Sequence, residues 1–166
     1  MTLGLSLSAF TLLHVIISLA GIGSGFIVLY GLLNSKRLDG WTAIFLTTTV
    51  LTSVTGFLFP FEKLLPSHIV GALSLVILAI AIFARYSRRM TGAWRGVYVI
   101  TAAIALYLNC FVAVVQAFLK VPALHAMAPH GSEPPFLVAQ LIVLAIFVWL
   151  TYRAAKRFHA IAAQTT

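Results

Sequence analysis

Five runs of apolar residues dominate the sequence, and each is long enough to cross a lipid bilayer as a helix. A spanning helix needs about 20 predominantly apolar residues. Because no water reaches the bilayer core, backbone polar groups there must be bonded within the protein, which restricts the spanning segments to helices or closed barrels. We therefore predict an all-α fold, an integral membrane bundle of five transmembrane helices, at approximately 7–33, 41–59, 65–83, 96–119 and 136–152.

The composition agrees with a membrane protein of one domain. Of the 166 residues, 61% are hydrophobic and only 8% are charged, whereas about a quarter of the residues in soluble domains are charged. The length suits a single transmembrane domain over residues 1–166. We expect the first run to be retained as a span, because no basic residue precedes it and no signal-peptide cleavage pattern ends it. The one cysteine, Cys110, cannot form an internal disulfide.

The positive charge predicts an orientation. The net charge is +8, but the basic residues lie in short clusters between apolar runs, so we expect a lipid bilayer and no nucleic acid as the partner. With the N-terminus outside, the outer segments hold two basic residues, Lys63 and Lys120, and the cytoplasmic segments hold the other nine of the eleven: Lys36, Arg37, Arg85, Arg88, Arg89, Arg95, Arg153, Lys156 and Arg157. Cytoplasmic loops carry such an excess. We predict an N-out/C-in protein of a bacterial inner membrane.

Polar side chains within the spans gather toward the outer face. His14 lies about two turns inside the first span and shares a helical face with Gly21 and Gly25, where small residues permit close approach of a helix or a flat ligand. Ionisable groups at that depth usually face the bundle interior. With the predicted topology, four residues border one polar pocket and are the candidates for binding a cofactor: His14, His68, Gln116 and Gln140. A simpler alternative is that these groups only bond neighbouring helices.

Three kinds of ligand suit this pocket. Histidines on two spans can ligate haem b axially, and a quinone would take hydrogen bonds from His, Gln or Thr in an apolar slot. The outer connection, residues 120–135, carries His125, His130 and Met127, which together with His14 or His68 would form a donor set that suits copper or zinc. The spacing of these histidines matches no established zinc motif.

The motifs that the sequence lacks reduce the number of possible functions. The sequence has no phosphate-binding loop, no nucleophile elbow and no acidic pair within the spans, which argues against an ordinary enzyme or a proton-driven transporter. We expect the protein to bind a small ligand, with haem b or quinone favoured, or to assist a membrane complex, with another membrane subunit or as a homo-oligomer. The alternative is a structural or assembly subunit without a ligand, and a transporter of a small solute or metal comes third.

Several short segments resemble a family of small polytopic bacterial inner-membrane proteins. They are LDGWTA at 38–43, TSVTGF at 52–57 with FPF at 59–61, and VPALHA at 121–126 with SEPPF at 132–136. The resemblance covers most of the chain and implies the multi-pass architecture. It implies no activity and no site residues, since that family has no established activity.

Overall fold

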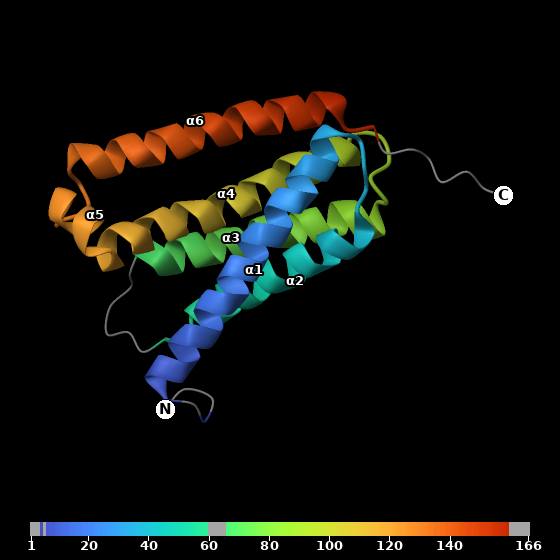
Figure 1. Cartoon of the computed structure of the whole chain (residues 1–166). Helices are drawn as coiled ribbons and strands as arrows, with labels where there is room; N and C mark the ends of the chain where they lie inside the picture. The colour runs from blue at the N-terminus through green and yellow to red at the C-terminus, as the bar shows by residue number, and fades with distance from the viewer. Residues whose placement is uncertain (1–3, 5, 60–65, 160–166) are drawn as a thin grey trace.

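The computed structural model describes residues 4, 6–59 and 66–159, and over these residues all regular structure is helical, without strands (Figure 1). The prediction of an all-α fold is confirmed. The elements are α1 (Leu7–Leu33), α2 (Asp39–Gly56), α3 (Pro66–Ile82) with the π-helix η1 (Phe83–Ser87), α4 (Trp94–Lys120), α5 (Pro122–Met127) and α6 (Pro134–Arg157).

Four helices are long and apolar enough to cross a membrane: Leu7–Leu33, His68–Ser87, Trp94–Lys120 and Pro134–Arg157. They correspond to the first, third, fourth and fifth predicted runs. The second run is helical as α2, but its aspartate, threonines and serine lower its hydropathy. Four of the five predicted spans therefore meet this criterion.

The helix boundaries differ from the predicted ones at the end of α2, within the outer connection and at both ends of α6. α2 ends at Gly56, three residues before the predicted end, in a turn where the Phe57 N–H donates to the Val54 carbonyl. The predicted outer connection at 120–135 contains the short helix α5, whose first residue, Pro122, suits the first turn of a helix. α6 begins at Pro134 and runs five residues beyond the predicted 152. Leu65, the predicted start of the third span, lies outside the described residues.

α1 packs tightly only along its second half. A Cβ added at Gly25 would lie 2.5 Å from Leu106 Cδ1 of α4 and 2.9 Å from Phe45 Cε2 of α2. Seven of the eight buried residues of α1 lie at or beyond Gly21, and Phe10 is the only one nearer the start. Figure 1 shows α1 crossing the bundle at a steep angle, so that its first half projects away from α4 and α6. The small residues of α1 therefore fix the point at which three helices meet.

Gly25→Ala should destabilise the bundle, because the new methyl group would overlap Leu106 and Phe45, two of the most deeply buried side chains. We expect a loss of about 1–3 kcal/mol, typical of overpacking, seen as a lower unfolding temperature in detergent. The matched control is Gly23→Ala, where a Cβ would meet nothing within 4 Å. Equal unfolding temperatures for the two variants would contradict this packing.

Candidate functional site

The candidate site begins where α1, α2 and α4 converge. At Gly21, an added Cβ would lie 3.3 Å from Thr49 Oγ1 and 3.5 Å from Asn109 Nδ2. Asn109 is buried, and its side-chain amide donates a hydrogen bond of 3.2 Å to Thr49 Oγ1. This bond joins α4 to α2 directly beside the α1 backbone, because glycine leaves no side chain in the way.

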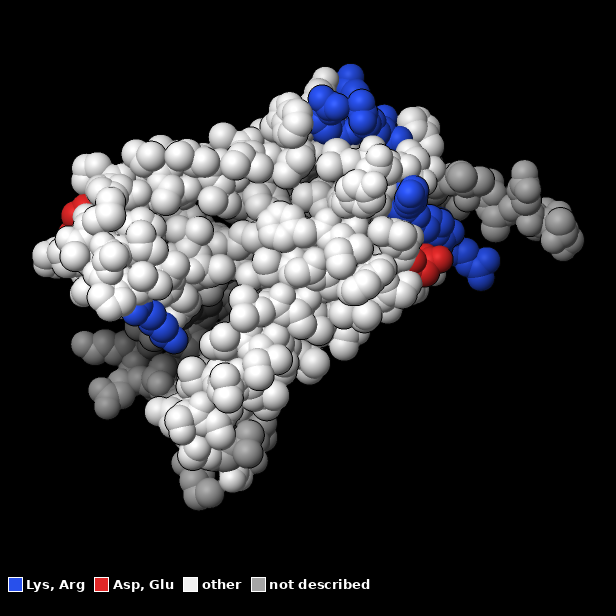
Figure 2. All heavy atoms as spheres, viewed as in Figure 1, with Lys and Arg blue, Asp and Glu red and all other residues white. Residues whose placement is uncertain are grey.

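Beyond this junction α1 and α4 diverge toward the end of the bundle that carries α5. The surface is hollowed between the two helices there (Figure 2). On α1 the face that holds Gly21 continues to Ser18 and His14, both half-buried. On α4 the face that holds Asn109 continues, seven residues on, to the exposed Gln116. We call the space bordered by these faces the wedge.

His14 is anchored to α2 by one ring nitrogen. Its Nδ1 lies 2.7 Å from Thr55 Oγ1, and the Thr55 hydroxyl itself donates to the Leu51 carbonyl at 2.7 Å. Since the threonine proton is used in that bond, Thr55 Oγ1 accepts from the Nδ1–H of a neutral imidazole. The other nitrogen, Nε2, then carries a lone pair that can accept a hydrogen bond or ligate a metal.

His14 and His68 contact opposite sides of the end of α2. The His14 ring packs edge-on against Phe59, with centroids 5.2 Å apart. The buried His68 ring packs against Phe57, with centroids 5.7 Å apart. His14 thus belongs to the contact between α1 and α2, and His68 to that between α2 and α3. The structure does not bring the two predicted histidines together.

The two predicted glutamines also separate. Gln140 is buried between α6 and α4, where its Nε2 donates to the Phe111 carbonyl at 3.2 Å. Phe111 is two residues from Asn109, so it faces away from the wedge. Gln116 makes no hydrogen bond to any described residue. Of the four predicted pocket residues, His14 and Gln116 therefore border the wedge, whereas His68 and Gln140 lie at other helix contacts.

The predicted metal ligands lie on the surface at the α5 end. His125 is exposed on α5, and His130 is bonded to Glu133, with 2.8 Å between Nδ1 and Oε1. Within the described ranges, no three His, Cys, Asp or Glu side chains are grouped so that they could hold a metal ion. The copper or zinc site stays a prediction. Among the described residues, no third His, Cys, Asp or Glu is grouped with His125 and His130 as a possible metal ligand.

Glu133 is held as a carboxylate by the loop before α6. Its oxygens accept from the backbone N–H groups of His130 and Ser132, each at 3.0 Å, and from the His130 ring. Desolvation raises the pKa of the Glu133 carboxyl, but these hydrogen bonds outweigh it and lower the pKa from 4.5 to about 2.

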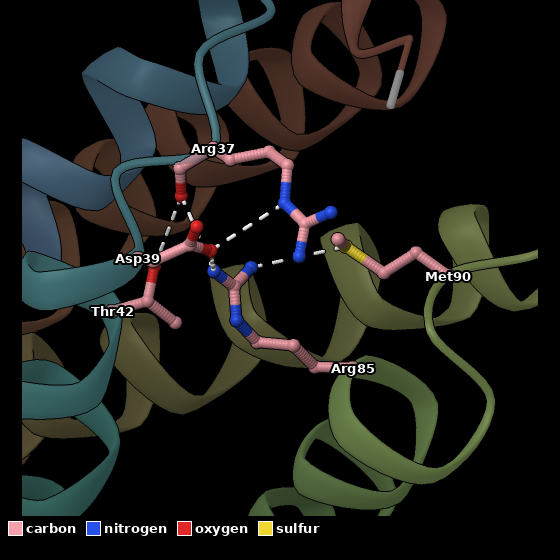
Figure 3. A network of polar contacts seen from close by, with 5 residues as sticks. All are labelled: Arg37, Asp39, Thr42, Arg85 and Met90. Carbon is pink, nitrogen blue, oxygen red and sulfur yellow. Dashed lines mark hydrogen bonds and ion pairs between the residues drawn. The ribbon is translucent and has the colours of Figure 1, made fainter. Parts of the chain in front are cut away.

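An ion-pair network around the buried Arg85, at the opposite end of the bundle, was not predicted. Arg85 of η1 is only 3% exposed, and it pairs with Asp39 at the start of α2 (Figure 3). Its guanidinium also contacts Met90 Sδ at 3.8 Å and lies 5.0 Å from the Tyr98 ring centroid. From the sequence alone, Arg85 is interpreted only as one of the positive charges that set the orientation. The sequence feature that could have indicated this ion pair is Asp39, an acidic residue that lies beside a basic cluster.

Comparisons with known proteins give no family for this chain: no family model matches it, and no curated protein or solved structure does either.

The Glu133 carboxylate should stabilise the loop before α6 in a pH-dependent way. Because the folded pKa lies below 4.5, this stabilisation is complete above about pH 4.5 and is lost as the pH falls toward 2. We expect an NMR titration in detergent to show the carboxyl carbon and the His130 amide shifting together with a midpoint near 2. In Glu133→Gln the amide shift should lose this transition. A carboxyl midpoint near 4.5 would contradict the bonding described here.

Proposed function

We propose that the protein spans a bacterial inner membrane five times, with α2 as the additional span. α2 packs against both α1 and α3, so it shares their environment. Its hydroxyls do not need water, because Thr48, Ser53 and Thr55 donate to carbonyls one turn back at 2.7–3.0 Å. Such bonds let threonine and serine lie in hydrocarbon at little cost.

We propose the N-out/C-in orientation on the basis of charge. Basic residues gather at one end of the bundle, around the α1–α2 connection, η1 and the end of α6, which we call the basic end (Figure 2). The α5 end carries Lys120 as its one basic residue among those described. The positive-inside rule assigns the basic end to the cytoplasm, and the wedge then opens toward the outer leaflet.

We further propose that the wedge binds the headgroup of an isoprenoid quinol or quinone. The observation that carries this proposal is Gln116, an amide exposed within a transmembrane helix and without a hydrogen-bond partner among the described residues. An unsatisfied amide in an apolar medium is unfavourable by several kcal/mol (about 2–7). A ligand oxygen in the wedge would satisfy it.

The two sides of the wedge offer complementary groups. The His14 Nε2 lone pair would accept a hydrogen bond from a quinol hydroxyl, while the Gln116 amide would donate to the oxygen across the ring. Lys120, one turn beyond Gln116, adds a donor at the outer edge. The apolar flanks of α1 and the surrounding lipid suit an isoprenoid tail.

Haem b has less support than a quinol. A haem held by both histidines would require them to face one gap, whereas they contact opposite sides of α2. A haem with His14 as a single axial ligand would use the same Nε2 lone pair, and the absorbance spectrum of protein expressed with haem would reveal it.

The second candidate is a structural or assembly subunit, and one set of bonds favours it. His14 is bonded to Thr55, Asn109 to Thr49, and Gln140 to the Phe111 carbonyl. Each bond joins two helices and needs no ligand. Gln116 distinguishes the two candidates, because it joins no pair of helices.

Purified protein in detergent should bind a short-chain ubiquinol analogue, and Gln116→Leu should weaken binding about five- to tenfold, as expected for the loss of one hydrogen bond. Isothermal titration calorimetry measures both affinities. His14→Ala should weaken binding similarly but also lower the unfolding temperature, since it removes the bond to Thr55. Gln140→Leu, which leaves the wedge intact, should bind like the wild type.

Absence of quinol binding, or equal affinity for Gln116→Leu and the wild type, would contradict the proposal. A Soret band in protein expressed with excess haem, lost in His14→Ala, would assign the wedge to haem instead. If neither ligand binds and His14→Ala only lowers the unfolding temperature, the structural candidate is correct.

A further inference from the structure

A groove runs along the outside of the bundle in the half that carries the basic end. It encloses about 270 Å³ between α2 and the end of α3, and apart from one threonine and the tyrosine hydroxyl its lining is apolar: Ala43, Leu46, Thr47, Val50, Leu51, Ile82 and Tyr86. This volume is just below the range of small-molecule pockets, about 300–1,000 Å³, and suits a single chain better than a bulky ring system.

The ion-pair network lies at the start of α2, one turn from the groove. Asp39, Ala43 and Thr47 follow one another at intervals of four residues, so they lie on one face of α2, with Asp39 at its start. Arg85 directly precedes Tyr86, which lines the groove, and its guanidinium lies 5.8 Å from the centroid of the Tyr86 ring. The apolar groove therefore points toward a cluster of charges.

That cluster has an unbalanced positive charge. Two guanidinium groups, of Arg37 and Arg85, meet the single carboxylate of Asp39, which leaves a net charge of +1. Arg37 contacts Asp39 through Nε at 3.4 Å, and its two terminal nitrogens have no partner among the described residues (Figure 3). Its side chain is 41% exposed. A guanidinium fork in this position matches the geometry of a phosphate group.

We propose that this groove binds an anionic phospholipid, with one acyl chain between α2 and α3 and the phosphate on Arg37. The fixed carboxylate of Asp39 orients the Arg37 guanidinium, and the net charge at the head of the groove favours a lipid with a net negative charge. The groove lies between α2 and α3, whereas the wedge lies between α1 and α4, so this site does not depend on the proposed function.

Native mass spectrometry of the detergent-purified protein tests this site by titration with phosphatidylglycerol and, separately, phosphatidylcholine. We expect tighter binding of phosphatidylglycerol, weakened about fivefold in Arg37→Gln, since one basic residue near an anionic headgroup contributes that much. Arg37→Lys should retain most of the affinity. Ala43→Trp, which leaves every charge in place and puts an indole in the groove, should weaken binding at least as much.

Two controls separate a specific site from general attraction. Arg153→Gln removes a charge from the basic end whose guanidinium lies over the Trp149 ring of the same helix, α6, and Val138→Trp adds an indole to the exposed face of α6. Both should bind phosphatidylglycerol like the wild type. Equal weakening by Arg37→Gln and Arg153→Gln, unchanged binding by Ala43→Trp, or equal binding of the two lipids would overturn the proposal.

Discussion

The hydrogen bond from Asn109 to Thr49, made directly over the backbone of Gly21, is the contact on which the arrangement of the bundle depends. In a bilayer both polar side chains must find protein partners, and here they find each other across α2 and α4. Gly21 and Gly25 let α1 approach this point closely, so that α1 crosses α4 here and diverges beyond. The wedge is the direct result of that crossing.

The same constraint accounts for the different chemistry of the two ends. Toward the α5 end, the polar side chains on the helix faces are mostly joined in pairs between helices, such as His14 with Thr55, so that Gln116 is conspicuous as an amide without a helix partner among the described residues. Toward the basic end, the buried Arg85 pairs with the Asp39 carboxylate and lies over the face of Tyr98. A neutral ligand suits the first environment and an anionic headgroup suits the second.

Much of the fold follows from the sequence, because helix length and helix faces are local properties. The first run predicted α1 from Leu7 to Leu33, and the spacing of His14, Gly21 and Gly25 placed them on one face. The spacing could not show which neighbour each face meets. The predicted topology places His14 and His68 in one pocket, whereas Thr55 and Phe57 direct them to opposite sides of α2. The Arg85–Asp39 pair, 46 residues apart in the sequence, was likewise beyond any local pattern.

Cysteine accessibility in intact cells tests the central claim, that five helices cross the membrane with the wedge on the outside. In a Cys110→Ser background, single cysteines replace Lys36, Thr91 and Ser132, which are all exposed, and a membrane-impermeant maleimide is applied before or after permeabilisation. The account predicts that the cysteine at 132 reacts in intact cells, whereas those at 36 and 91 react only after permeabilisation. If the cysteines at 36 and 91 react from opposite sides of the membrane, α2 does not cross. If in intact cells the cysteine at 91 reacts and the cysteine at 132 does not, the orientation is the reverse of the one proposed.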